Sequence, residues 1–264
     1  MNARSMRLSD RIPQGVQPTM PPKHVSDHRD ICQGSWSILC DFDGTVARED
    51  VVDVLLERYG LPGWKALEQR WRDGHIGSRE CMQGQVELLA VSVDELDAYL
   101  DRVEIDPAFR TFVANARARF MPVRIVSDGL DYAIRRILRR YSLDDLPIVA
   151  NTLLRADPPG RWRLESPFAA DGCRSGTCKC RQVTAGRDAR RERTLFVGDG
   201  ESDFCVASKV DLVFAKNHLI EHCRVAGISY RPITGFADAL NLLPLLTDQN
   251  EALSRAVPVT HPEC

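Results

Sequence analysis

The chain has 264 residues, 44% of them hydrophobic, which is enough for one large domain with a substantial buried core. Its 35 Lys and Arg residues nearly balance 37 Asp and Glu residues, and the net charge of −2 gives no indication of a nucleic-acid or membrane surface. No apolar run approaches the roughly 18 residues that a membrane span requires.

Both ends of the chain are expected to lie outside the folded core. Residues 1–34 are polar and rich in Pro and lack the apolar segment of a secretory signal, so we predict a disordered tail. Residues 248–264 are predicted to form a loose C-terminal tail. We expect a cytoplasmic protein, and the sequence leaves its assembly open between a monomer and a homodimer.

Two carboxylates, Asp41 and Asp43, stand directly after the apolar run 38–40. If that run is a buried strand, both acids leave its carboxyl end, where parallel α/β sheets gather their ligands. Acids so close repel each other unless a cation lies between them or one holds a proton. The arrangement predicts Mg²⁺ bound by oxygen ligands and one carboxylate free to act as a nucleophile. The alternative is an Asp-Gly turn with solvated acids.

The next eighty or so residues, up to Ser127, are far more than one crossover helix needs. Their apolar spacing predicts helices at 51–59, 64–71, 78–90 and 96–103, and then a return to the core over 107–120. Ser92 and Glu95 have the spacing of a capping box. We therefore expect an inserted helical-bundle cap over residues 49–107, with a purely structural insertion as the alternative.

A second strand-like run, 123–126, ends in Ser127-Asp128-Gly129 and is followed by a helical pattern over 132–141. A hydroxyl and free backbone N–H groups at a helix N-terminus can bind a phosphate group. The alternative is that Ser-Asp-Gly simply begins an ordinary helix. Farther on, 151–164 has the pattern of a hairpin around Pro158-Pro159-Gly160.

A third strand-like run, 194–197, ends in Gly198-Asp199, and Asp203 follows on the next helical turn. Lys179 stands just before a helix that we predict over 181–186. A lone lysine usually lies on the surface. Lys179 is a candidate site residue only because of its position in the order of these motifs.

Nine cysteines are present, and disulfides are not expected without an export signal. Cys40 and Cys205 are expected to be buried hydrophobic residues. The cluster Cys173, Cys178 and Cys180 flanks Lys179, but its spacing matches no common zinc site. Reduced thiols are the preferred interpretation, with a zinc site or a redox-sensitive site as alternatives.

The order Asp-x-Asp-x-Thr, Ser, Lys, Gly-Asp-x-x-x-Asp resembles the haloacid-dehalogenase superfamily of phosphatases over residues 36 to about 215. The resemblance implies a doubly wound, Rossmann-like parallel sheet of residues 35–48 and 108–247. It assigns Asp41 as the nucleophile and Asp43 as the acid that protonates the leaving oxygen and later activates water. The acid at position 43 argues against dehalogenase chemistry, which the family runs without one.

The resemblance also implies the remaining site residues. Phosphate oxygens are assigned to donors at Gly44, Thr45, Ser127, Gly129 and Lys179. The Mg²⁺ site is assigned to Asp41, the Asp43 carbonyl and Asp199, with Asp203 supporting Lys179 and metal-bound water.

Three positions in the predicted cap bear on the substrate. Phosphoserine phosphatases, which the cap resembles, carry Glu where this chain has Asp50, and Arg where it has Gln85. Arg79 could replace that arginine only if the cap has shifted. A neutral amide cannot clamp a carboxylate as a guanidinium does, which disfavours phosphoserine.

The phosphatase group of methionine salvage is a closer match. It shares the Asp at position 50, the strand-rich excursion and the Gly-Thr-Cys of residues 176–178. We expect a phosphomonoester hydrolase acting on 2-hydroxy-3-keto-5-methylthiopentenyl-1-phosphate. The alternatives are phosphoserine and phosphoethanolamine or phosphocholine phosphatases, and, in another class, a phosphotransferase or mutase.

Overall fold

The computed structural model describes the backbone of residues 36–186 and 193–255, with side chains for 36–183 and 193–246. The predicted tail at 1–34 lies outside the described residues, as does the predicted tail beyond 255. None of the helices among the described residues combines the length and the apolar character of a membrane-spanning segment.

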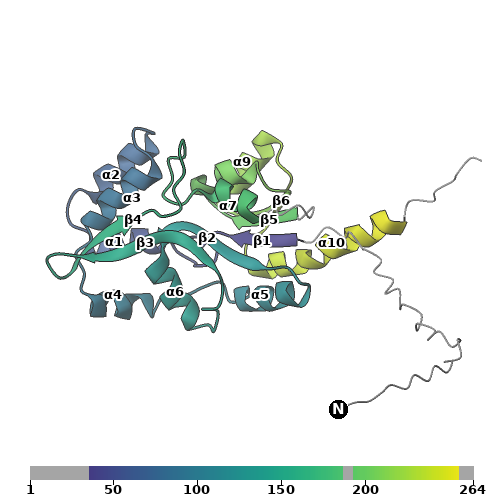
Figure 1. The fold of residues 1–264 in the computed structure, drawn as a ribbon, viewed down its shortest axis with the longest axis horizontal. Coiled ribbons are helices and arrows are strands. Elements are labelled where there is room, and N and C mark those ends of the chain that lie inside the picture. The colour runs from purple at the N-terminus through teal and green to yellow at the C-terminus, as the bar shows by residue number, and fades with distance from the viewer. Residues whose placement is uncertain (1–35, 187–192, 256–264) are drawn as a thin grey trace, which may run out of the picture. The chain divides into compact units, whose positions relative to one another are not determined.

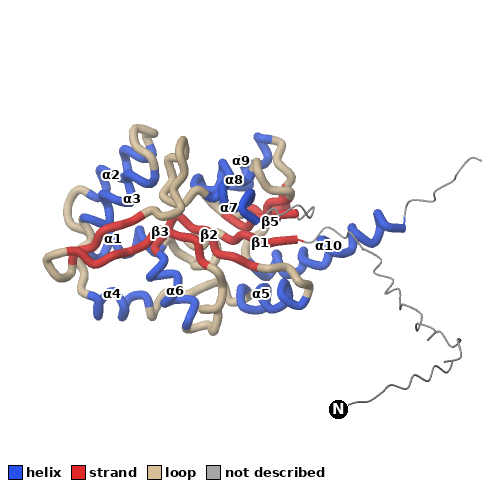
Figure 2. Tube along the Cα trace, viewed as in Figure 1, coloured by secondary structure: helices blue, strands red, loops and turns tan. Residues whose placement is uncertain are grey.

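The described residues form a seven-stranded sheet in the order β4-β3-β2-β1-β5-β6-β7. Figure 2 draws its strands in red and labels β3, β2, β1 and β5. The strands are β1 (Trp36–Cys40), β2 (Val123–Leu130), β3 (Ile148–Ala156), β4 (Arg161–Glu165), β5 (Arg193–Gly198), β6 (Leu212–Ala215) and β7 (Tyr230–Pro232). Neighbouring strands are parallel except for β3 and β4. This sheet confirms the predicted α/β fold.

The sheet is covered on both faces, which explains the nearly continuous apolar runs of its strands. In β1, Ile38 and Cys40 belong to one apolar layer and Leu39 to the other, because successive side chains point to opposite faces. The first layer lies under α5 (Phe109–Ala118), α6 (Asp131–Arg139) and α10 (Phe236–Arg255). The second lies under α7 (Lys179–Gly186), α8 (Phe204–Ala207) and α9 (Asn217–Ala226). Figure 1 shows α7 and α9 on that side of the sheet.

Of the five helices between β1 and β2, four lie where the cap is predicted: α1 (Val51–Tyr59), α2 (Trp64–Arg72), α3 (Ser78–Glu87) and α4 (Val93–Leu100). Asp50 caps α1 by accepting from the N–H groups of Val52 and Asp53. The predicted capping box of Ser92 and Glu95 is confirmed at α4. The helical pattern and the helix N-cap residues, Asp50 and Ser92, therefore encode these helices locally.

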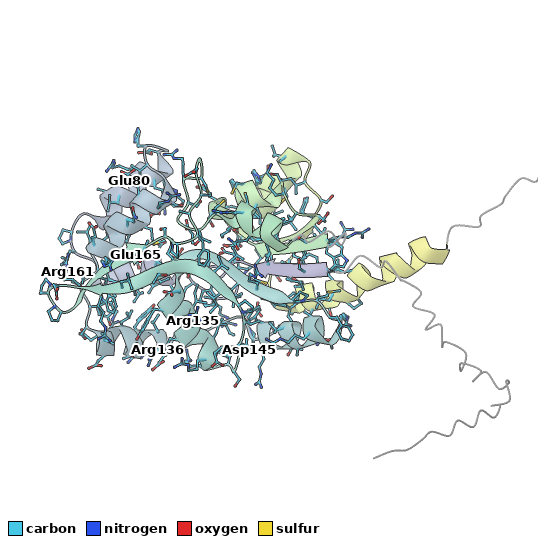
Figure 3. All side chains as sticks on the ribbon, viewed as in Figure 1. Glu80, Arg135, Arg136, Asp145, Arg161 and Glu165 are labelled. Atoms are coloured by element: carbon cyan, nitrogen blue, oxygen red, sulfur yellow. The ribbon has the colours of Figure 1, made fainter. Side chains whose placement is uncertain are left out.

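The last of these helices, α4, lies beside α6 of the core (Figure 1). Arg136 of α6, which Figure 3 labels, forms ion pairs of 2.8 Å with Asp97 and 2.7 Å with Asp101. Tyr132 donates to Asp97 from the same face of α6. Arg136 and Tyr132 of α6 thus supply contacts between the insertion and the core.

The predicted hairpin at 151–164 is confirmed as β3 and β4, with Leu153 opposite Leu164 in an antiparallel pair. It packs against the insertion. The Gly160 carbonyl accepts from Val91 N at 3.0 Å, and Trp162 Nε1 donates to the Val91 carbonyl at 2.9 Å. The hairpin therefore fixes the connection between α3 and α4.

The C-terminal end differs from the prediction of a loose tail from residue 248. Helix α10 continues to Arg255. Residues 251–254, Glu-Ala-Leu-Ser, are compatible with helix and include three strong helix formers, so the helix has no local reason to stop at 248.

Candidate active site

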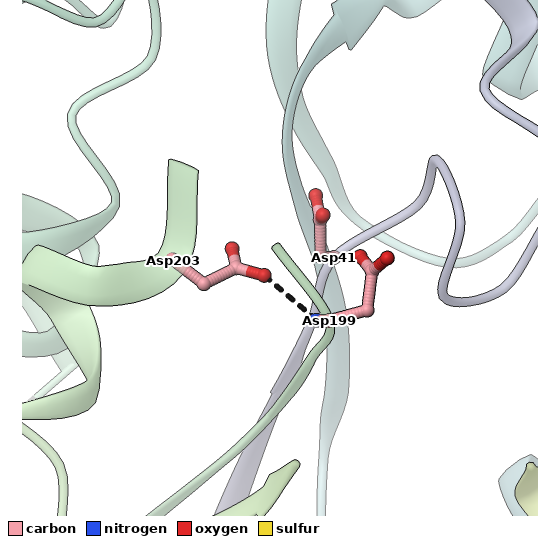
Figure 4. Close-up of side chains that lie close together, drawn as sticks. All are labelled: Asp41, Asp199 and Asp203. Atoms are coloured by element: carbon pink, nitrogen blue, oxygen red, sulfur yellow. Dashed lines mark hydrogen bonds between the residues drawn. The ribbon is translucent and has the colours of Figure 1, made fainter. Parts of the chain in front are cut away.

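The motif residues that are far apart in the sequence meet at one edge of the sheet. Asp41 follows β1, Ser127 lies near the end of β2, and Asp199 follows β5. Since these three strands are neighbours and parallel, their carboxyl ends share that edge. Carboxylate oxygens of Asp41, Asp199 and Asp203 lie within 4.8 Å of one another (Figure 4).

Lys179 is the central cation of this cluster. Its side chain is 2% exposed, and Nζ lies 2.8 Å from Asp41 Oδ1 and 2.5 Å from Asp203 Oδ1. Burial alone would lower the pKa of Lys179, but the charges of Asp203 and Asp41 outweigh it and raise that pKa. The ammonium therefore stays charged.

Asp203 is held in place from both of its oxygens. Oδ1 accepts from Lys179, while Oδ2 accepts from the backbone N–H of Asp199 at 2.9 Å and of Gly200 at 3.2 Å. Figure 4 shows the bond to Asp199 N as a dashed line. With its oxygens so occupied, Asp203 orients Lys179 and the 199–200 turn.

Asp41 and Asp199 present the crowded carboxylates of the cluster. Burial raises the pKa of Asp41 to about 8, with Lys179 opposing the rise and Asp203 and Asp199 adding to it. Burial and Asp203 also raise the pKa of Asp199. Thr45 Oγ1 donates to Asp199 Oδ1 at 3.0 Å, and Asn217 Nδ2 lies 3.2 Å from Oδ2.

Asp43 points away from that cluster, toward β2 and the start of α1. Its Oδ1 accepts from Val51 N at 3.1 Å, and its Oδ2 lies 3.4 Å from Ser127 Oγ. Burial, followed by the charges of Asp50 and Asp41, raises the pKa of Asp43 well above its usual range. A carboxyl with a raised pKa next to the nucleophile position can hold a proton near neutral pH.

A cavity of about 410 Å³ opens over these residues. Its floor includes Asp41, Asp43, Ser127, Gly129 and Asp199, and the insertion contributes the opposite wall. The residues on that wall are Asp50, Val52, Asp53, Glu68, Trp71, Arg72, Ser78, Cys81, Met82 and Gln85. The site is therefore a pocket between core and insertion.

The three predicted cap positions have different surroundings. Asp50 lines the cavity while capping α1. Gln85 also lines it, is 3% exposed and donates to Glu68 Oε2 at 3.0 Å. Arg79 is engaged elsewhere, because its guanidinium donates to the carbonyls of Cys173 at 2.8 Å and Ser175 at 3.1 Å.

The cysteine cluster lies beside the site. Cys173, Cys178, Cys180 and Cys205 line an adjoining cavity of about 600 Å³, and all four are free thiols. Cys205 is exposed, contrary to the prediction that it is buried, since Val206 and Ala207 take the buried face of the short helix α8. Among the described residues, the group suited to a metal ion is the carboxylate trio, with no cysteine in it.

Comparison with known proteins agrees with this geometry. The model of the haloacid dehalogenase-like hydrolase family matches residues 38–208. The chain belongs to that family. This haloacid dehalogenase-like hydrolase is 30% identical, over 212 residues, to a 2-hydroxy-3-keto-5-methylthiopentenyl-1-phosphate phosphatase of Exiguobacterium sibiricum. That alignment covers 78% of this chain and 95% of the relative.

Other relatives and solved structures extend the comparison. Pdp3-interacting factor 1 of Schizosaccharomyces pombe is 28% identical over 214 residues, covering 76% of this chain and 91% of that protein. A substrate-bound phosphoserine phosphatase shares the fold with a TM-score of 0.60 at 19% identity, covering 79% and 98% of the two chains. The family and the phosphatases among the relatives make this hydrolase a phosphatase.

Two residues that contact the site of this hydrolase, Lys216 and Asn217, were not predicted from the sequence. Lys216 Nζ donates to the Gly44 carbonyl at 2.8 Å, and Asn217 contacts Asp199. Both follow β6, whose carboxyl end shares the edge of the sheet with β1 and β5. Reading 212–215 as another parallel strand would have pointed to them.

Gly44 permits a test of the packing between the two acidic loops. It has φ +68°, and a Cβ there would lie 2.6 Å from Asp199 Oδ2. We expect Gly44→Ala to displace that carboxylate and reduce p-nitrophenyl phosphate hydrolysis by roughly a hundredfold.

Gly227→Ala is the matched control, because Gly227 has φ +65° and nothing within 4 Å of a built Cβ. Both variants carry a similar backbone strain of about 1–2 kcal/mol, so similar activities in the two would contradict the steric argument.

Proposed function

We propose that this phosphatase is a Mg²⁺-dependent hydrolase of a small phosphomonoester, acting through an aspartyl-phosphate on Asp41. The observation that carries the proposal is the position of Asp41 at the floor of the cavity, 2.8 Å from the buried Lys179 ammonium. Phosphoryl transfer depends mainly on positioning and on neutralising the charge of the phosphoryl oxygens. The contacts described above suit both tasks.

The donor set fits a magnesium ion. Asp41 and Asp199 offer hard oxygen ligands within reach of one ion, and the Asp43 backbone carbonyl would complete the protein's share. Asp203 is the weaker candidate for direct ligation because its oxygens already accept from Lys179 and two amides. When bound, Mg²⁺ would offset the crowded negative charge and polarise the phosphoryl group.

The side chains then divide the reaction between them. A carboxylate oxygen of Asp41 attacks phosphorus, and the bond from phosphorus to the ester oxygen breaks. Asp43 gives its proton to that leaving oxygen. In the second half, Asp43 takes a proton from water as the water oxygen attacks phosphorus, and the bond to Asp41 breaks to release inorganic phosphate. Ser127 and the amides of Gly44 and Gly129 would hold the phosphoryl oxygens.

For the substrate, we favour the thioether-bearing enol phosphate named for the relative of 30% identity. Trp71, Cys81 and Met82 give the cap wall an apolar and sulfur-containing part suited to a methylthio group. Among described arginines, the one lining the cavity is Arg72, and its Nε donates to Glu68 at 3.0 Å. A substrate carboxylate would therefore lack the clamp that phosphoserine needs.

One observation favours a second substrate class. Asp50, Asp53 and Glu68 line the same wall, and burial followed by the charges of Asp50 and Glu68 raises the pKa of Asp53 to about 7. Such an acidic wall suits a cation, so phosphoethanolamine and phosphocholine are the second candidates.

The role of Asp41 is tested by Asp41→Asn. Because the amide is a poor nucleophile of the same size, we expect turnover of p-nitrophenyl phosphate to fall at least roughly a thousandfold, with no phosphoenzyme after acid quench. Asp145→Asn is the control, since Asp145 pairs with Arg117 on the surface. Retained turnover in Asp41→Asn would remove Asp41 from the mechanism.

Metal dependence is tested by chelation. Treatment with EDTA should abolish hydrolysis, and added Mg²⁺ should restore it, because the carboxylates of Asp41 and Asp199 lie close together while the Lys179 ammonium pairs with Asp41 and Asp203 and not with Asp199. The measurement is the initial rate as a function of free Mg²⁺. An undiminished rate in metal-free buffer would refute this part of the proposal.

The substrate is tested by kcat/KM across a panel of the methylthio-keto-enol phosphate, phosphoethanolamine, phosphocholine and phosphoserine. We expect the first to rank highest and phosphoserine to rank below it. A ranking led by the two amine-bearing esters would select the second candidate. A ranking led by phosphoserine would contradict the argument that Gln85 and Arg79 do not bind a substrate carboxylate.

A further inference from the structure

Asp128 lies between the two phosphate-site residues Ser127 and Gly129, and the proposed reaction gives its side chain no role. It is 8% exposed and lines the cavity. Its carboxylate accepts hydrogen bonds from three separate parts of the chain, at Ser78, Asn151 and Thr177.

One carboxylate oxygen joins β2 to the segment that precedes Lys179. Asp128 Oδ1 accepts from Thr177 N at 2.8 Å and lies 3.2 Å from Asn151 Nδ2 of β3. Thr177 stands two residues before Lys179, so this bond restrains the backbone that delivers the ammonium to Asp41. Charge-assisted bonds to backbone N–H groups are stronger than neutral ones.

The other oxygen reaches the insertion. Asp128 Oδ2 accepts from Ser78 Oγ at 2.7 Å, and Ser78 is the first residue of α3. The next residue reinforces the contact, because Arg79 N donates to the Arg174 carbonyl at 3.0 Å and its guanidinium donates to the carbonyls of Cys173 and Ser175. We call Ser78, Arg79, Asp128 and the 173–175 carbonyls the cap latch.

We infer that Asp128 is a positioning residue that couples docking of the α3 end of the cap to the placement of Lys179 and of the phosphate-binding end of β2. With the latch formed, the cap wall and the floor of the cavity are joined through one carboxylate. When Ser78 leaves, Asp128 keeps its bonds to Thr177 and Asn151, so the core half of the latch stays ordered and can receive the cap again. This inference rests on the proposed site.

The local packing supports a latch of fixed geometry. Gly176 lies so close to Asn151 that an added Cβ would be 2.3 Å from Asn151 Oδ1. Thr177 Oγ1 and Asn151 Oδ1 are buried without a hydrogen-bond partner in the described residues. Unpaired buried groups destabilise this region, so the bonds to Asp128 are needed to hold it.

The experiment removes the cap half of the latch alone. Ser78→Ala should lower kcat/KM roughly tenfold or more, since it deletes a hydrogen bond to a carboxylate that forms when the cap docks. Ser78→Thr keeps the hydroxyl, so its kcat/KM should stay within about twofold of the wild-type value. Ser92→Ala is the matched control, because Ser92 caps α4 through Glu95 and does not line the cavity.

A double-mutant cycle separates coupling from general weakening. Asp128→Asn keeps the size of the side chain and removes its charge. If both residues act through one bond, adding Ser78→Ala to Asp128→Asn should cause little further loss, whereas independent effects would multiply. Wild-type kinetics in Ser78→Ala, or a full multiplication of the two losses, would overturn the inference.

Hydrogen–deuterium exchange gives a readout without catalysis. The Arg79 amide should exchange faster in Ser78→Ala while the Thr177 amide stays protected, and Asp128→Asn should expose both amides. Unchanged exchange of the Arg79 amide in Ser78→Ala would reject the latch even if no ester is hydrolysed. Conversely, the expected exchange pattern in a protein without phosphatase activity would refute the proposed function and leave the latch standing.

Discussion

The site depends on a buried ammonium between two carboxylates. Lys179 is 2% exposed, and a charge removed from water to that extent is stable only when it is paired and hydrogen-bonded. Asp41 and Asp203 pair with it, and Asp203 is in turn held by amides of the 199–200 turn. The loop after β1, the start of α7 and the turn after β5 must therefore assemble together.

The order of the strands makes that assembly possible. β1 lies between β2 and β5, so a residue leaving its carboxyl end has phosphate-binding donors on one side and acids on the other. Asp43 is directed toward the β2 side and the cap, while Asp41 faces Lys179 and Asp199. Two carboxylates two residues apart thus meet different surroundings, which suits the roles that we propose for them, Asp43 as proton carrier and Asp41 as nucleophile.

The sequence predicted the features that local periodicity and spacing encode. The sheet-edge acids Asp41 and Asp199, the capping box at Ser92 and the β3–β4 hairpin all follow from short patterns. Lys179 has no local pattern, and only its order among the motifs pointed to it. The contact of Lys216 with Gly44 was missed because the strand at 212–215 was not predicted. The contact of Ser78 with Asp128 was missed because it depends on distant packing, and nothing near Ser78 in the sequence indicates its partner.

The hairpin of β3 and β4 has a consequence for the size of molecule that can react. The hairpin is hydrogen-bonded to the chain at Val91, after α3. The cap latch is hydrogen-bonded at Ser78 and Arg79, at the start of α3, so the insertion is attached to the core on both sides of this helix. A phosphate carried on a bulky macromolecule would have to enter the cavity of about 410 Å³ between this insertion and the core to reach Asp41. We therefore expect free metabolites to be processed and phosphoproteins to be rejected on steric grounds.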